Sequence, residues 1–171
     1  DPFYNQQYYL NNTGQTGGTA NIDINAPEAW AAISTSCYAP RVAVLDVGVE
    51  PHNDLGNRYL TGFTALNPAG SGLPSSGLNH GQACAGIIGA THNNNLGIAG
   101  VAPTSLIFPV NGFIGISNVS YAADAIDAAW RPTRGNADVI SNSWTYATAP
   151  SFAEITDAIS QARTSGRNGL G

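Results

Sequence analysis

The sequence predicts an α/β protein in which a mostly parallel sheet is flanked by helices. Three short apolar runs, at 41–46, 105–110 and 138–141, are rich in β-branched residues, as buried parallel strands are. Segments with helical signals separate these runs, which gives the alternating order of βαβ units. Ligands of such folds bind at the carboxyl ends of the strands, so the polar residues there are the candidates for function.

The N-terminal region predicts an arm followed by a helix. Residues 1–24 are polar and Gly-rich, and we expect them to form an extended arm laid over the body. Asn25 is a candidate N-cap, and Pro27 and Glu28 suit the first turn of a helix that runs through Ile33. The strand at 41–46 follows and ends in a carboxylate, Asp46.

Three further helices are expected. Small residues dominate 80–90, so a helix there must pack closely, because each Gly costs about 1 kcal/mol relative to Ala. An apolar stripe predicts a helix over 118–130 (Ala122, Ala125, Ile126 and Ala129). Ser151 and Glu154 have the spacing of a capping box, and the helix that they open should end near Gly166.

Composition bounds the function classes. The 171 residues make at most one domain, and only 10% are charged against about 25% in average proteins. Six arginines, no lysine and a net charge of −5 leave no basic face for nucleic acid. No apolar stretch approaches the ~20 residues of a membrane span. Low charge with 20 Gly and 10 Pro is typical of a secreted or cell-envelope protein.

The two cysteines, Cys37 and Cys84, allow either one disulfide or two buried thiols, and we favour the thiols. Asp46 at a strand end and His80 at a helix start have the residue types of two members of a nucleophilic triad. In a triad the carboxylate fixes the tautomer of the imidazole, which takes a proton from the nucleophile. Each residue alone is more often a cap or a satisfied polar group.

Four segments together resemble the subtilisin-like serine proteases, in the order of that family. Val42-Ala-Val-Leu-Asp-Val-Gly-Val-Glu50 resembles the catalytic-aspartate motif, and His80-Gly-Gln-Ala-Cys-Ala-Gly86 the catalytic-histidine motif. Gly97-Ile-Ala-Gly-Val-Ala-Pro103 looks like the segment after the histidine helix, and Asp138-Val-Ile-Ser-Asn-Ser-Trp144 like the strand that lines the substrate cleft. Some features, Cys84 among them, are similar to the kexin/furin branch and related bacterial enzymes.

The resemblance implies a role for each matching residue. Asp46 would orient the base and His80 would be the base. An extended peptide or protein substrate would pair with the backbone of one wall (Ser143, Trp144 and Thr145), and Asn111 and Gly112 would form the opposite wall. Calcium is common in the family, and Asp54, Asn93 and Asn95 are the candidate ligands, although an Asn-rich turn is also simply a turn.

The departures from the family pattern are as informative. The family carries its oxyanion asparagine and nucleophilic serine further on, and no serine here has the matching setting. We therefore expect residues 1–171 to be the N-terminal part of a single catalytic domain, with an incomplete sheet. It would be inactive until the C-terminal remainder of the domain supplies the missing groups. The stretch 145–148 lacks acidic residues, so cleavage after paired basic residues is not expected.

Two other functions remain open on the sequence alone. The first is a metal-dependent hydrolase that uses Asp46, His52, Asp54 and His80 as ligands, although no HExxH helix is present. The second is a non-catalytic peptide-binding α/β module, whose binding would be indifferent to His80→Ala.

Overall fold

Four parallel strands form the sheet of the computed structural model, which describes residues 1–33, 38–67, 69–112, 119–146 and 152–171. The strands are β1 (Arg41–Asp46), β2 (Phe63–Thr64), β3 (Leu106–Asn111) and β4 (Val139–Asn142), in the order β2-β3-β1-β4. The predicted parallel α/β architecture is confirmed. The sequence did not predict β2, because two residues carry no periodicity.

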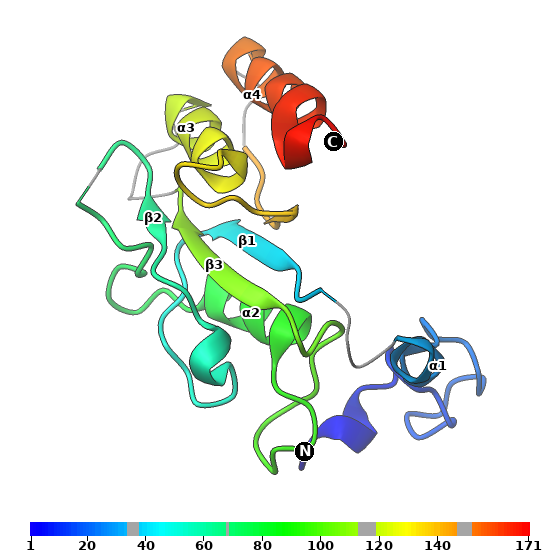
Figure 1. The fold of residues 1–171 in the computed structure, drawn as a ribbon. Coiled ribbons are helices and arrows are strands. Elements are labelled where there is room, and N and C mark those ends of the chain that lie inside the picture. The colour runs from blue at the N-terminus through cyan, green and yellow to red at the C-terminus, as the bar shows by residue number, and fades with distance from the viewer. Residues whose placement is uncertain (34–37, 68, 113–118, 147–151) are drawn as a thin grey trace.

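Helices cover both faces of the sheet (Figure 1). Helix α2 (His80–Gly89) lies on one face, and α3 (Val119–Trp130) and α4 (Ala153–Ser165) lie on the other. Helix α1 (Ala26–Ala32) and the N-terminal segment lie to one side of the sheet. Among the described residues, no helix has both the length and the apolar character needed to span a bilayer.

The core explains why these segments form these elements. Strand β1 is buried over 42–46 and alternates its side chains between the two faces, so that Leu45 packs with the α3 side and Val44 with the α2 side. The predicted alanine-rich stripe of α3 is fully buried against the sheet. On the opposite face, α2 buries Gly81, Ala85 and Gly89, and these small residues allow the close packing that the sequence required.

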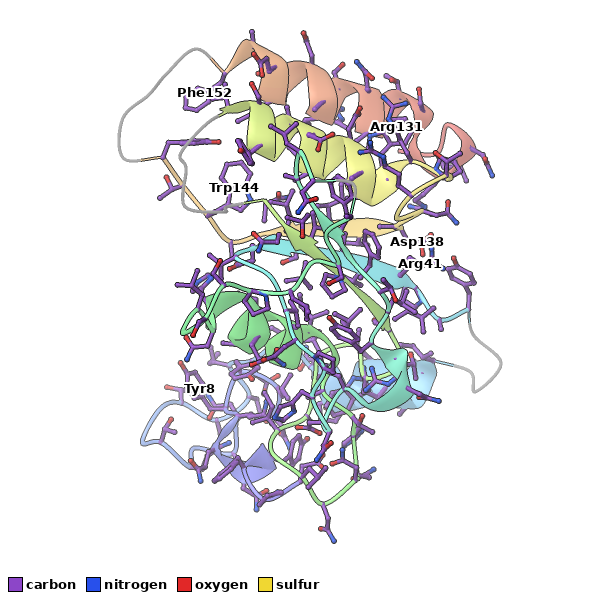
Figure 2. All side chains as sticks on the ribbon, turned by 90° about the vertical axis from the view of Figure 1, so that its left-hand side faces the viewer. Tyr8, Arg41, Arg131, Asp138, Trp144 and Phe152 are labelled. Atoms are coloured by element: carbon purple, nitrogen blue, oxygen red, sulfur yellow. The ribbon has the colours of Figure 1, made fainter. Side chains whose placement is uncertain are left out.

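Strand β1 is joined at its first residue, Arg41, to Asp138, the residue before β4. The backbone N–H of Arg41 donates to the Asp138 carboxylate at 2.8 Å, and the Asp138 N–H donates back to the Arg41 carbonyl. Figure 2 shows the two residues side by side at this end of the sheet. The double contact fixes the register that runs from Val42–Val139 to Leu45–Asn142.

The N-terminal segment differs from the prediction. Residues 1–24 form a one-turn 3-10 helix, Tyr4–Gln6, and a series of turns rather than an extended arm. The buried Gln7 side chain anchors the segment, because its amide donates to the Ala99 carbonyl and accepts from the Ala99 N–H, both at 2.8 Å. Leu10 is fully buried beside Ala26 and Ala99, which draws the chain into this folded path.

Helix boundaries are close to those predicted, but the caps are not. Helix α1 begins at Ala26, yet the Asn25 side chain makes no capping hydrogen bond, and Asn25 is in the left-handed region with φ 54°. Helix α4 begins at Ala153 with Phe152 at the N-cap, and Ser151 lies outside the described residues. Glu154 accepts a hydrogen bond from Ser120 of α3 at 2.7 Å. The helix ends at Ser165 with Gly166 as its C-cap, which agrees with the predicted end near Gly166.

Candidate active site at the carboxyl edge of the sheet

Asp46 is the last residue of the central strand β1, between β3 and β4. It is paired in register with Asn111, and the Gly112 N–H donates to its carbonyl at 3.1 Å. Its carboxylate, 3% exposed, accepts a hydrogen bond from the Val47 N–H at 2.8 Å. Strand pairing and this hydrogen bond together fix the carboxylate at the carboxyl edge.

His80, the first residue of α2, completes a pair with Asp46. Its Nδ1 lies 2.9 Å from each carboxylate oxygen of Asp46, while the side chain is 61% exposed. Because an ionised carboxylate only accepts hydrogen bonds, Nδ1 carries the proton and Nε2 is left as an acceptor. A buried acid and an open imidazole in this tautomer are the geometry of a general base.

Two glycines allow this close approach. A Cβ at Gly81 would lie 2.3 Å from the Gly48 carbonyl oxygen and 3.0 Å from the Asp46 Cβ. Gly48 has φ +104°, and a Cβ there would lie 2.5 Å from the Pro74 nitrogen. Both glycines allow two segments that are distant in the sequence to pack closely. This role could not be predicted from the positions of the glycines in the sequence.

Cys84 lies one helical turn after His80, and its Sγ is 3.9 Å from Nδ1. It is a free thiol of intermediate burial, so the prediction of a buried thiol is only partly correct, and Cys37 lies outside the described residues. Among the described His, Cys, Asp and Glu side chains, one group could share a metal ion, and it consists of Asp46, His80 and Cys84.

The ligand set predicted for a metal-dependent hydrolase is therefore wrong. His52 and Asp54 do not join Asp46 and His80 in one group within the described part of the chain. Instead, the exposed His52 accepts a hydrogen bond through Nδ1 from the Asp54 N–H at 3.1 Å. The two residues are close neighbours in the sequence, and a local turn is enough to explain their contact.

One predicted substrate wall is accessible. Ser143 and Thr145 are exposed directly after β4, and the Leu45–Asn142 register places Ser143 level with Asp46. Trp144 packs against the core on the α3 side and meets Tyr146 edge-on, with ring centroids 5.6 Å apart. Figure 2 shows Trp144 between the sheet and the helices of that face.

The two residues predicted for the opposite wall are buried. Asn111 is buried, and its side-chain amide donates to the Leu73 carbonyl at 2.8 Å. Gly112 is buried too, because a Cβ there would meet Leu45 at 3.0 Å and Ala125 at 3.3 Å. The loop at Leu73 and helix α3 thus cover these two positions. The sequence around 111–112 predicts only the end of a strand, so it could not show which distant segments cover it. Residues 113–118 lie outside the described part.

The candidate calcium residues lie near one another around a turn. Asp54 is 5% exposed, and its carboxylate accepts from the Asn94 side-chain amide at 2.7 Å and from the Ile98 N–H at 3.3 Å. Asn93 and Asn95 adopt left-handed φ angles of 59° and 65°, which asparagine tolerates in turns. Asn94, which the sequence analysis did not select, contacts Asp54 through its side chain.

Comparisons with known proteins show a family whose sequence model matches most of this chain. The sequence model of the family described as "Subtilase family" matches residues 39–170. Human neuroendocrine convertase 2 is 31% identical over 151 residues, which is 78% of this chain and 24% of the convertase. Thermitase from Thermoactinomyces vulgaris is 34% identical over 111 residues, 59% of this chain and 38% of thermitase. The chain thus spans about a quarter of the length of the convertase.

Solved structures share the fold. A serine protease of Aeromonas sobria superposes with a TM-score of 0.76 at 24% identity, covering 99% of this chain and 30% of the protease. A protease structure from Pseudoalteromonas arctica gives a TM-score of 0.71 at 27% identity, covering 96% of this chain and 55% of that chain. The parallel sheet and its flanking helices are common to all three.

Proposed function

Because the chain belongs to the subtilase family of serine proteases, we propose that it provides the proton-transfer half of an endopeptidase active site. The observation that carries this proposal is the contact of His80 Nδ1 with the buried Asp46 carboxylate at 2.9 Å. The reaction is hydrolysis of peptide bonds by acyl transfer, with peptides or proteins as substrates.

Each residue of the pair has a defined task. Asp46 holds the proton on Nδ1 and stabilises the imidazolium that forms during the reaction. His80 Nε2 takes the proton of the attacking serine and later gives it to the leaving amine. The backbone at 143–145, where Ser143 and Thr145 are exposed, accepts the extended substrate by adding it as a further strand. Substrate binding thus places the scissile bond near the imidazole.

The nucleophilic serine and the oxyanion donor come from outside this chain in the proposed enzyme. Within the described residues, the side chains that contact His80 nitrogens are those of Asp46 and Cys84, and no hydroxyl does so. Loss of a nucleophile or of an oxyanion donor each lowers the rate by orders of magnitude. We therefore expect no proteolysis from the 171 residues alone.

The open edge of β4 supports the docking of a C-terminal remainder. Strand β4 is the last strand of the described sheet, and its Val139 side chain is 53% exposed. The connection from β3 through α3 leads to β4, and α4 lies on the same face as α3. Because parallel crossovers are right-handed, a strand after α4 is expected beside β4, on its free edge.

Cavities lie beside this edge on both faces of the sheet. One of about 400 Å³ is lined by Ile140 of β4 together with residues of α3 and α4, and one of about 450 Å³ is lined by Val139 and Ser141. Each leaves space next to β4 that further chain could fill.

A fluorophosphonate probe, which reacts with activated serines, tests the proposal. We expect no labelling of the 171-residue chain, and labelling of a longer protein that carries this chain followed by further C-terminal sequence. His80→Ala should abolish the labelling of the longer form, whereas His52→Ala, at an exposed loop histidine, should leave it unchanged. Labelling of the short chain would contradict the proposed origin of the nucleophile.

The same experiment separates the enzyme from a non-catalytic peptide-binding module. A module that has lost its chemistry would bind peptides equally well before and after the substitution His80→Ala, and its longer form would not react with the probe. We further propose a secreted or cell-envelope location, which the low charge and the absence of lysine support.

A further inference from the structure

We propose that Asp46, His80 and Cys84 form a binding site for a zinc-type divalent cation. The three side chains offer a carboxylate oxygen, an imidazole nitrogen and a sulfur, and these ligand atoms all lie within 4.8 Å of one another. Oxygen, nitrogen and sulfur are the donors that proteins use for Zn²⁺, and three protein ligands leave the fourth position of a tetrahedral ion for water.

The distances need little adjustment. Nδ1 of His80 is 2.9 Å from the Asp46 oxygens and 3.9 Å from the Cys84 sulfur. Metal–ligand bonds of about 2.0–2.3 Å set neighbouring ligand atoms of a tetrahedral ion at about 3.3–3.8 Å from one another. The observed separations lie on either side of that range, so side-chain rotations can admit the ion.

The surrounding structure supports entry and retention of the cation. His80 and Cys84 are four residues apart on α2, so both side chains lie on one face of the helix. Asp46 is fixed at the end of β1, while the His80 side chain is 61% exposed and leaves a path from solvent. When the ion binds, the Cys84 thiol loses its proton to the solvent, and the thiolate and carboxylate together offset the charge of the ion.

Binding would switch off the base. A metal ion on Nδ1 takes the position of the proton that Asp46 holds there, and that proton moves to Nε2. Nε2 is the atom that must accept the proton of the attacking serine, so the metal-bound imidazole cannot do so. This inhibitory consequence rests on the proposed function, whereas the binding itself does not.

Cobalt(II) is the probe for the site, because a thiolate ligand gives it a charge-transfer absorption. We expect one equivalent of Co²⁺ to produce this absorption in the reduced 171-residue chain, and Zn²⁺ to displace it. Cys84→Ser should remove the absorption and weaken Zn²⁺ binding by at least about tenfold. Cys37→Ser, which removes the other thiol of the chain, is the matched control and should keep both.

The position of the His80 proton gives a second measurement. Nitrogen NMR of the imidazole should show Nδ1 protonated without metal and Nε2 protonated with Zn²⁺, in the wild type and in Cys37→Ser. Absorption that survives in Cys84→Ser, or disappears in Cys37→Ser, would overturn the site. If Zn²⁺ binds but the longer protein has no proteolytic activity to inhibit, the proposed function fails and the metal site stands.

Discussion

At the scale of single residues, the active-site geometry depends on a position without a side chain. Gly81 follows the histidine, and its Cα faces the Gly48 carbonyl and the Asp46 Cβ. The approach of α2 to the end of β1 has no room for even a methyl group. The distance between acid and base is therefore set by backbone packing as much as by the two side chains.

Gly81→Ala tests this dependence. Overpacking against a backbone carbonyl should destabilise the fold by about 1–3 kcal/mol and separate His80 from Asp46. Urea denaturation measures the first effect, and the imidazole NMR spectrum measures the second. Gly86→Ala in the same helix is the control, because its Cβ would meet only Ile98 at an ordinary 3.7 Å. That change should stabilise by about 0.5–1 kcal/mol, as Ala does relative to Gly in a helix; equal effects at both positions would refute the argument.

These residues also show what a sequence can reveal. Asp46 and His80 were predictable because strand ends and helix starts are local signals and because motifs surround them. The burial of Asn111 and the role of Gly81 were not, since each depends on a segment more than 30 residues away. The proximity of Cys84 to His80 Nδ1 could have been predicted, because i,i+4 spacing on the predicted helix places both side chains on one face.

At the scale of elements, one buried side chain is central to the contact between the N-terminal segment and the body, which Asp1 and Phe3 also join through hydrogen bonds to residues 93–97. Gln7 forms paired hydrogen bonds with both backbone groups of Ala99, and its amide also lies 2.6 Å from the Tyr9 hydroxyl. These hydrogen bonds give the N-terminal segment a defined position, which its polar, Gly-rich sequence did not predict. The anchor lies beside the turn that follows α2.

Gln7→Ala should lower the free energy of unfolding by about 1–3 kcal/mol, because it leaves the buried Ala99 groups without partners. Chemical denaturation measures the loss. Gln6→Ala, at the exposed neighbour, serves as the control and should change stability by less than about 0.5 kcal/mol. A Gln7→Ala chain as stable as the control would show that the arm is not held in this way.

The turn beside Asp54 carries the calcium proposal. Carboxylate and amide oxygens, which calcium prefers as ligands, are present around this turn. Arg58 is a neighbouring cation: burial lowers its pKa, and the charge of Asp54 partly offsets that shift. Asp54 and Asn93 or Asn95 would supply side-chain oxygens, and backbone carbonyls of the turn would complete the shell.

Thermal unfolding in excess calcium and in chelator tests this proposal. Calcium at about 100 times its dissociation constant would stabilise the folded chain by about 2.7 kcal/mol and raise Tm accordingly. Asp54→Asn should remove the calcium-dependent rise, whereas Asp157→Asn, at an exposed carboxylate on α4, should retain it. Equal Tm values in calcium and chelator for the wild type would exclude a site of that affinity.

At the scale of the whole molecule, the two edges of the sheet differ. The edge strand β2 is only two residues long, whereas β4 exposes a longer edge flanked by apolar side chains on both faces. Ile87, Val101 and Ile159 are 40–47% exposed near this edge. Unpaired apolar edges of this kind pair with other chains.

The isolated chain should therefore self-associate as its concentration rises. Sedimentation velocity should show a growing fraction of dimers or larger species, and Val139→Lys should reduce that fraction by placing a charge on the edge strand. Leu66→Lys, at an exposed apolar residue near the other edge, is the control and should leave association unchanged. A chain that stays monomeric at high concentration would argue against an open β4 edge.

The elements that hold Asp46 against His80 have one more property in common: β1, α2 and β3 all lie within residues 41–111. The cluster that packs them together also draws on that stretch alone (Val44, Val49, Leu55, Ala85 and Ile107). During synthesis, at about 5–20 residues per second, this stretch emerges from the ribosome before α3, β4 and α4 emerge. We expect the acid and the imidazole to meet on the nascent chain, so that a hydroxyl translated later would arrive at a base that is already oriented.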